Sequence, residues 1–233
     1  MKSINLFLLF AFLYSLSVLS QDNNLGVKTT MRSFDSEINI GKAGLWIPGK
    51  DVDNYVKGSL YLFPNWIGPY YVFSKNRKTT QLLNLNYNLK TKNLEYLMSN
   101  DSVFQYDLDQ IDHLVYLNKT YKIIQNTQLN GLFFEVFNGD KLKIFKETSI
   151  VVGKGGFDRL TQTKLNEDKY VQVYSYYVFA DGKYEKEKIN KKFILKNTID
   201  KADLIKKFVL KYKLNYTSDD DVKRILNYYY YSL

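Results

Sequence analysis

The sequence predicts a mainly β protein: an antiparallel β meander forming a roll or barrel-like sheet, followed by a C-terminal αα hairpin. Three observations predict this fold. Short apolar runs alternate with polar residues at a period of two through most of the chain. Dipeptides that favour tight turns separate these runs, so neighbouring strands should pair antiparallel. Residues 197–233 change to a helical period, which is typical of amphipathic helices.

The amino-terminal residues have the character of a secretory signal peptide. Lys2 gives a positive start, Ile4 to Leu19 is almost wholly apolar, and Ser20 precedes the expected cleavage point at Gln21. The apolar stretch is shorter than the roughly 20 residues of a spanning helix, which favours a cleaved signal at 1–20 over a membrane anchor. We therefore expect a periplasmic or extracellular protein with no transmembrane segment in its mature chain.

Composition excludes several classes of protein. The chain contains no cysteine, which excludes disulfides, thiolate metal sites and a lipid-attached lipoprotein. Its net charge of +9 comes mainly from scattered lysines. Nucleic-acid readers favour arginine and concentrate their charge on one face, so we expect no nucleic-acid partner.

The middle of the chain divides into two segments. Residues 21–57 are polar and glycine-containing, and should form an extended lead-in. Residues 58–196 should form the antiparallel β domain. Its expected strands are 58–63, 69–74, 83–89, 94–98, 104–108, 112–118, 120–126, 131–137, 140–147, 169–179, 183–189 and 193–196.

Local patterns predict the faces and turns of these strands. Leu85 and Tyr87 alternate with Asn86 and Asn88, which predicts one packed face and one solvated face. Asn138-Gly139 and Asp181-Gly182 favour the positive φ angles of two-residue hairpins.

The glycine-rich stretch GKGGFDRL (153–160) lacks the order of a phosphate-binding loop and should be a flexible connection.

The αα hairpin is expected at residues 197–233. Thr198 is a candidate N-cap for the first helix. Ser218 with Asp221 three residues later resembles a capping box and predicts the start of the second helix. Helices this short are marginal alone, so their apolar faces should pack on the sheet.

No catalytic constellation, cofactor site or metal site is visible, and we expect a protein that is not an enzyme. His113 is expected to be a half-buried strand residue, with Asp112 on the opposite strand face. Glu135 is either an interior acid or the sign of a solvated face, and the second is favoured. Asp107, Asp109 and Asp112 lack the glycine and glutamate of a calcium loop.

Aromatic residues are the candidates for ligand or partner contact. Trp46 and Trp66 lie in turns bounded by glycine and proline, where a ring is either a plug for the sheet or an exposed platform. Tyr228, Tyr230 and Tyr231 belong to a run of four tyrosines that cannot all face inward on one helix.

Several short motifs of the chain are structural in character. They are Gly58, Ser59, Tyr61 and Leu62; Tyr87, Asn88, Leu94 and Glu95; Phe133 to Val136; Lys213 to Asn215; and the tyrosine-rich final helix. These motifs resemble those of uncharacterised exported β-rich proteins of gram-negative bacteria. The resemblance implies an envelope setting and a β-rich fold over residues 58–233, and it carries no assigned activity or catalytic residue.

Together these patterns predict a non-enzymatic exported cell-envelope protein that binds an envelope protein or a surface polymer. Two alternatives stay open. One is a carrier of lipophilic ligands with a cavity inside the curled sheet. The other is a carbohydrate-binding or carbohydrate-active protein, which needs an aromatic platform and, for catalysis, two converging carboxylates.

Overall fold

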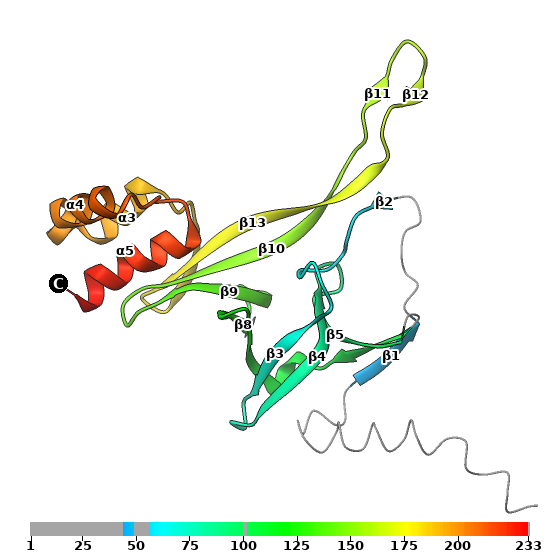
Figure 1. Cartoon of the computed structure of the whole chain (residues 1–233), viewed down its shortest axis with the longest axis horizontal. Coiled ribbons are helices and arrows are strands. Elements are labelled where there is room, and N and C mark those ends of the chain that lie inside the picture. The colour runs from blue at the N-terminus through cyan, green and yellow to red at the C-terminus, as the bar shows by residue number, and fades with distance from the viewer. Residues whose placement is uncertain (1–43, 49–55, 100–101, 233) are drawn as a thin grey trace, which may run out of the picture. The chain divides into compact units, whose positions relative to one another are not determined.

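The computed structural model describes residues 44–48, 56–99 and 102–232. The expected signal peptide at 1–20 and nearly all of the segment 21–57 lie outside these residues, as do the side chains of residues 44–48. The described residues form a β domain and a set of C-terminal helices (Figure 1).

Twelve of the described strands belong to one mostly antiparallel sheet, which confirms the mainly β prediction. Eleven follow the order β1-β6-β5-β4-β3-β7-β8-β9-β10-β13-β14, and β2 pairs in parallel with β13. Because β1 and β14 stand at opposite ends of this order, the described sheet is open. The strands are β1 (Gly44–Pro48), β2 (Val56–Lys57), β3 (Ile67–Ser74), β4 (Thr79–Asn88), β5 (Asn93–Ser99), β6 (Ser102–Tyr106), β7 (Ile111–Tyr116), β8 (Lys119–Gln125), β9 (Asn130–Asn138), β10 (Lys143–Gly153), β13 (Asp168–Ala180) and β14 (Lys183–Glu187), and a separate pair contains β11 (Phe157–Asp158) and β12 (Thr163–Lys164).

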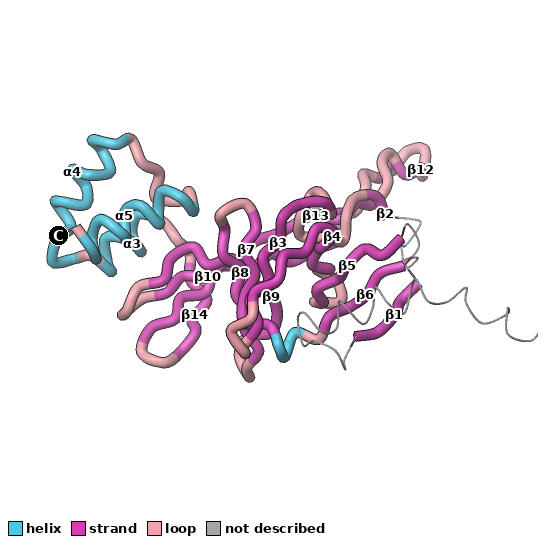
Figure 2. Tube along the Cα trace, turned by 60° about the horizontal axis from the view of Figure 1, so that its bottom comes forward, coloured by secondary structure: helices cyan, strands magenta, loops and turns pink. Residues whose placement is uncertain are grey.

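Strand β4 belongs to two parts of the sheet (Figure 2). Its residues 79–84 lie in the stretch that pairs with β3, and residues 85–88 pair with β5. The small part of the sheet therefore contains β1, β6, β5 and the end of β4. The large part runs from the start of β4 to β14.

Residues 58–63 do not form the expected strand. Tyr61 makes an isolated antiparallel bridge to Asn88, and the Leu62 N–H donates to the Tyr87 carbonyl at 2.9 Å. These contacts lay the segment along the end of β4 as a short irregular cover.

This cover overturns the predicted solvated face of β4. Asn86 and Asn88 are buried, with exposed fractions of 1% and 8%. The Asn86 side chain replaces the missing strand partner, because its Oδ1 accepts from the Phe63 N–H and its Nδ2 donates to the Phe63 carbonyl, both at 3.0 Å. The polar face is thus internal, and its amides are matched by hydrogen bonds.

The two predicted hairpin turns have different outcomes. Asp181 and Gly182 have φ angles of 49° and 77°, so the two-residue turn between β13 and β14 is confirmed. The Asn138-Gly139 prediction is wrong. The β9–β10 turn is longer, and the Gly139 N–H closes it by donating to the Leu142 carbonyl at 3.0 Å.

Strands β10 and β13 form a hairpin that is longer than the strands beside it. Residues 143–147 of β10 also pair with β9, but among the described pairings residues 148–153 pair only with β13. The glycine-rich stretch 153–160, expected to be a flexible connection, continues the hairpin into the β11–β12 pair. We call residues 148–175 the hairpin arm (Figure 1).

The C-terminal helices begin earlier than predicted. The expected strand at 193–196 is wrong, because these residues lie in α3. Asn190 caps this helix, with its Oδ1 accepting from the Phe193 N–H at 3.0 Å. The helical elements are η1 (Leu108–Gln110), α3 (Lys191–Asn197), η2 (Ile199–Lys201), α4 (Ala202–Tyr212) and α5 (Asp219–Tyr231).

The predicted caps of the helical hairpin hold only in part. Thr198 is not the N-cap of α4; it follows α3, and its buried hydroxyl donates to the Ile194 carbonyl at 2.9 Å. Ser218 does precede α5, but its side chain makes no capping bond. Asp221 instead accepts from the Asn215 N–H at 2.9 Å and so ties the inter-helix loop to α5.

The helices share a hydrophobic core with one face of β9, β10 and β13. The sheet contributes Phe137, Ile144 and Val178, and the helices contribute residues such as Ile205 and Ile225. This packing agrees with the expectation that helices this short need the sheet. Within the described residues, no helix is long and apolar enough to cross a membrane.

Candidate functional site

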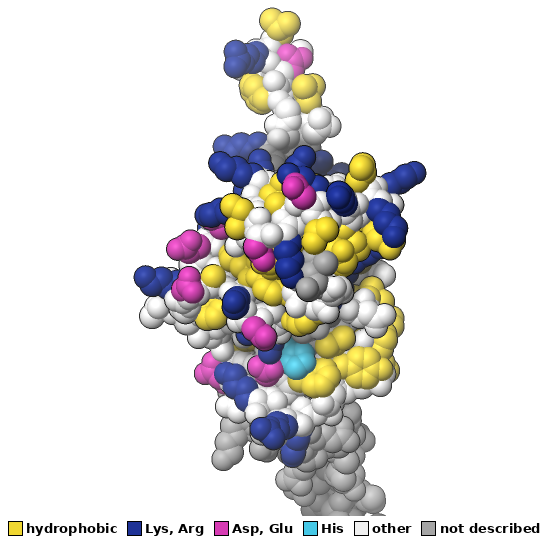
Figure 3. All heavy atoms as spheres, turned by 90° about the vertical axis from the view of Figure 1, so that its left-hand side faces the viewer, with side chains coloured by type: hydrophobic (Ala, Val, Ile, Leu, Met, Phe, Trp, Pro, Cys, Tyr) yellow, Lys and Arg dark blue, Asp and Glu magenta, His cyan; other side chains and the backbone are white. Residues whose placement is uncertain are grey.

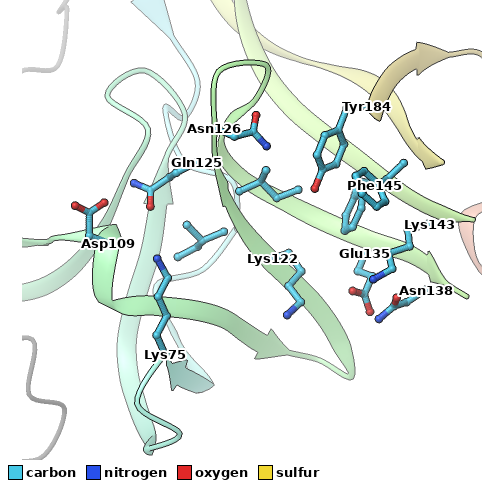
Figure 4. A pocket seen from close by; sticks show the side chains of 13 residues that line it. Lys75, Asp109, Lys122, Gln125, Asn126, Glu135, Asn138, Lys143, Phe145 and Tyr184 are labelled. Atoms are coloured by element: carbon cyan, nitrogen blue, oxygen red, sulfur yellow. The ribbon is translucent and has the colours of Figure 1, made fainter. Parts of the chain in front are cut away.

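A cleft of about 610 Å³ lies on the large part of the sheet, bordered by the β3–β4 turn, η1 and strands β8 to β10, β13 and β14 (Figure 4). Two of its lining residues, Ile124 and Phe145, belong to a small cluster of buried apolar residues. The cleft is lined by Lys75, Asp109, Lys122, Ile123, Ile124, Gln125, Asn126, Glu135, Asn138, Lys143, Phe145, Phe179 and Tyr184.

A β-bulge directs Glu135 into the cleft. Phe145 pairs with Glu135, whereas the preceding Ile144 pairs with Phe137, which leaves Val136 as the extra residue in β9. Strict alternation would place Glu135 and Phe137 on the same face. The bulge separates them, so that Phe137 joins the helix-facing core and the half-buried Glu135 lines the cleft.

Three lysines bring positive charge to the cleft. Lys75 follows β3, Lys122 lies in β8 and Lys143 begins β10. They outnumber the two acids of the lining, Asp109 and Glu135, so the cleft has an excess of positive charge. In Figure 4, Lys122 lies between the aromatic wall and the side that carries Lys75 and Asp109.

Lys122 is held by a charged group next to the cleft. Its Nζ lies 2.9 Å from Asp112 Oδ2, and the same oxygen lies 2.6 Å from His113 Nδ1. Partial burial opposes ionisation of Asp112, but the hydrogen bonds from His113 and Lys122 outweigh it, and the pKa of this carboxyl is lowered.

His113 is half-buried, and its ring stacks on Phe73 with centroids 4.3 Å apart. The expectation that Asp112 would lie on the opposite strand face from His113 is wrong, because the Asp112 carboxylate contacts the His113 ring.

Aromatic rings form the opposite wall. The Tyr184 ring lies 4.7 Å from Phe179 and 6.0 Å from Phe145, measured between centroids. Burial raises the pKa of the Tyr184 phenol, which keeps its hydroxyl protonated and able to donate. A ligand in this cleft would meet the aromatic rings and Lys143 on one side, and the Lys75 ammonium group on the other.

The predicted contact residues are not brought together in this cleft. Trp46 lies in β1, where its backbone pairs with Phe104, and its side chain is outside the described part. Trp66 is half-buried, and its ring meets the Tyr61 ring edge-on at 4.6 Å. This packing is that of a plug more than of a free platform.

The predicted tyrosines of α5 separate into packed and exposed side chains. Tyr228 stacks on Phe208 of α4 at 3.9 Å, and Tyr230 stacks on Phe137 of β9 at 5.5 Å. Tyr231 is 63% exposed and is the one of these three available to a partner.

A buried polar cluster in the small part of the sheet was missed by the sequence reasoning. Glu95 is 1% exposed and accepts from Tyr61 Oη at 2.9 Å, Asn88 Nδ2 at 3.1 Å and Gln105 Nε2 at 2.8 Å. Gln105 accepts in turn from Asn93 Nδ2 at 3.1 Å.

Burial is the largest influence on Tyr61, and together with the nearby carboxylate it raises the pKa of the phenol. The phenol therefore stays a donor. The periodicity assigned Asn88 to a solvated face, and Tyr61, Asn88 and Glu95 were noted only as members of short motifs, so neither signal predicted that they would meet.

The acidic residues near η1 have a structural role. Asp107 caps this short helix by accepting from the Asp109 N–H at 2.9 Å. Among the residues that the structure describes, no group of three or more His, Asp or Glu side chains is arranged to hold a metal ion.

Comparison with known proteins gives no family model, no curated protein and no solved structure that matches the chain.

Proposed function

We propose that this is a non-enzymatic exported protein of the cell envelope that acts by binding, and that its cleft holds an acidic segment of a surface polymer. The observation that carries the proposal is the pairing of an aromatic wall, Phe179 and Tyr184, with cleft lysines such as Lys122 and Lys143. Binding sites combine apolar ring surface with a few polar groups that fix orientation.

The charged and amide side chains that line the cleft favour a polar ligand over a lipophilic one. The lining carries three lysines, two acids and several amides, and burying these against an apolar ligand without hydrogen bonds would cost free energy. An acidic sugar chain offers carboxylates to the lysines and a less polar ring face to Tyr184. Lys122, already oriented by Asp112, enters such a contact with little loss of side-chain freedom.

The test is titration calorimetry with acidic oligogalacturonides and with neutral malto-oligosaccharides as the comparison. We expect the acidic chains to bind and the neutral chains to bind at least about tenfold more weakly, since a hydrogen bond to a charged group contributes roughly 1.5–3 kcal/mol. Lys143→Gln should weaken acidic binding about tenfold.

Lys223→Gln, on the exposed surface of α5, is the matched control and should bind normally. Equal affinity for acidic and neutral chains, or unchanged binding by Lys143→Gln, would reject the cleft as the site.

A further inference from the structure

We propose that the end of the hairpin arm is a membrane-docking element that inserts apolar side chains into a lipid bilayer carrying anionic headgroups. The inference is independent of the cleft, because the arm and the cleft are formed by different residues. It rests on three features of the arm: its apolar end, the cations behind that end, and the rigidity of the turn that presents them.

The end of the arm exposes large apolar side chains. Leu160 is 96% exposed, Leu165 is 62% exposed and Phe157 is 60% exposed. Val151 and Val152, further along β10, are also about half exposed. Exposed apolar residues gathered at one place mark an interaction surface, whereas scattered ones do not.

Cations surround this apolar end and lie behind it. The arm and the adjoining β2 contain five cations in this region, Lys57, Lys154, Arg159, Lys164 and Lys169, against the acids Asp158, Glu167 and Asp168. Figure 3 shows hydrophobic side chains at the far end of the projection, with Lys or Arg and Asp or Glu side chains beside them. Groups of cations next to apolar side chains match the layering of a bilayer, in which anionic headgroups lie outside the hydrocarbon.

A concave site within the arm, where the β10–β13 pairing gives way to the β11–β12 pair, can receive a headgroup. It has a volume of about 720 Å³, and its lining includes Lys57, Lys154 and Lys169. Lys57 pairs with Glu167 at 2.7 Å, whereas the described residues provide no ion pair for Lys154 or Lys169. Lys154 also interacts electrostatically with Asp168, and both ammonium groups can reach phosphate oxygens of a headgroup.

Backbone packing fixes this site. A Cβ on Gly155 would lie 1.7 Å from the Asn166 carbonyl oxygen, so only glycine allows the two strands to approach this closely. The Gly155 N–H donates to Asp168 Oδ1 at 2.8 Å, and the Leu165 N–H donates to the Gly156 carbonyl at 2.7 Å.

The turn at the end is also ordered by its own hydrogen bonds. Asp158 Oδ1 accepts from the Leu160 N–H at 2.8 Å, and these backbone bonds lower the pKa of the Asp158 carboxyl. Thr161 and Thr163 hydroxyls lie 2.7 Å apart. Leu160 is thus presented by a formed turn, and little conformational entropy remains to be lost on insertion.

The geometry favours a bilayer over a protein partner. A protein interface has an apolar centre on one surface with a polar rim. Here the exposed side chains of Phe157, Leu160 and Leu165 lie at the end of a two-stranded ribbon and not on one broad surface. A fluid hydrocarbon layer can surround such an end from all sides.

Vesicle co-sedimentation tests the proposal with the protein purified after secretion, carrying its natural amino terminus. The vesicles contain either phosphatidylcholine alone or a mixture with phosphatidylglycerol. We expect binding to the mixed vesicles, and a decrease as salt is added, because the cationic contribution is screened.

Two variants separate the apolar and the charged contributions. Phe157→Ser with Leu160→Ser should reduce partitioning at least about tenfold, since several buried methylene groups are lost. Lys154→Gln with Lys169→Gln should reduce it about tenfold on mixed vesicles only. The matched control is Leu210→Ser on α4, which removes a side chain that is 81% exposed and should leave partitioning unchanged.

Depth of insertion is measured with a single dye. Because the chain has no cysteine, Leu160→Cys and Leu210→Cys can each be labelled at one site with an environment-sensitive fluorophore. We expect a blue shift on mixed vesicles for the label at 160 and none for the label at 210.

Absence of sedimentation with either vesicle overturns the proposal, as does a label at 160 that stays in water while the protein sediments. Acidic oligosaccharide binding should be the same in the arm variants as in the natural protein, so failure here is distinguishable from failure of the cleft proposal.

Discussion

At the scale of single residues, the buried carboxylate of Glu95 is the group whose stability depends most on its hydrogen bonds. It is inaccessible to solvent, and its described hydrogen bonds come from three uncharged side chains, Tyr61, Asn88 and Gln105. A buried carboxylate costs free energy unless its hydrogen bonds are complete. The cluster therefore stabilises one arrangement of the 58–63 cover, because only that arrangement brings Tyr61 to Glu95.

Removing the acceptor should destabilise the small part of the sheet. Glu95→Ala removes the acceptor of two buried donors, Asn88 and Gln105, and of the half-buried Tyr61 hydroxyl, and we expect the free energy of unfolding to fall by about 2–4 kcal/mol, measured by urea denaturation. Tyr61→Phe, which removes one donor, should cost about 1 kcal/mol. Glu185→Ala, at an exposed position in β14, is the control and should change stability little. A Glu95→Ala protein as stable as the natural one would contradict this role.

At the scale of elements, one ion pair joins α5 to the sheet. Lys146 Nζ lies 2.7 Å from Asp219 Oδ2, and the Tyr176 hydroxyl donates to Asp219 Oδ1 at 2.8 Å. Both charged side chains are about four-fifths buried. Asp219 also stands in the first turn of α5, where a negative charge favours the helix dipole. The contact therefore fixes where α5 begins and where it docks.

Loss of this carboxylate should loosen the helix. Asp219→Asn keeps the size of the side chain but leaves Lys146 partly buried without its counter-ion, and we expect a loss of about 1–3 kcal/mol in urea denaturation. Burial alone would lower the pKa of Lys146, but Asp219 and Tyr176 outweigh it, so the pKa is raised. The stabilisation is thus complete below the ordinary lysine pKa of 10.5 and is lost only as pH rises through the raised value.

Lys223→Gln on the outer face of α5 is the control for this substitution. An Asp219→Asn protein that lost no stability at neutral pH would show that packing alone docks the helix.

At the scale of the whole molecule, the helices complete the hydrophobic core of the sheet. Phe137, Ile144 and Val178 on the sheet are buried in a cluster that the helices share. Burial of one such side chain contributes about 1.5–3 kcal/mol, so the packing of the C-terminal helices contributes a substantial part of the free energy of unfolding.

Deletion of residues 198–233 should therefore expose the apolar face of β9 and β10. We expect aggregation and a lower melting temperature, measured by light scattering and thermal unfolding. A truncated chain that stays monomeric with an unchanged melting temperature would instead show that the helices are a separable element that the sheet does not need. The Asp219→Asn protein serves as the comparison, since it weakens the docking of α5 without removing the helices.

Sequence periodicity predicted where strands lie better than it predicted which of their faces are buried. Residues 69–74, a short apolar run bounded by turn residues, and residues 94–98, which alternate, both lie in strands. Asn86 was assigned to solvent because nothing local shows that Phe63 would fold over it. Residues 193–196 were assigned to a strand because a short apolar run suits either element, and the cap at Asn190 decides for the helix.

Sequence periodicity could not predict which residues form the candidate cleft. Glu135 was expected on a solvated face, but it is half-buried in the cleft, and Phe133 and Phe137 are buried. Its separation from Phe137 depends on a β-bulge that the residue types do not predict. Lys75 and Tyr184 are far apart in the chain, and only the order of strands in the sheet brings them to one cleft. Trp66, chosen for its turn, packs against Tyr61 instead.

The strand order also has a consequence for how the chain folds. Most neighbours in the sheet are consecutive hairpins, which close short loops and can form early as synthesis proceeds. The β1–β6 and β3–β7 pairings span longer separations. Because β7 must be made before β3 gains its second neighbour, strands β7 to β10, β13 and β14 join strands β3 to β6 in one sheet only after that closure.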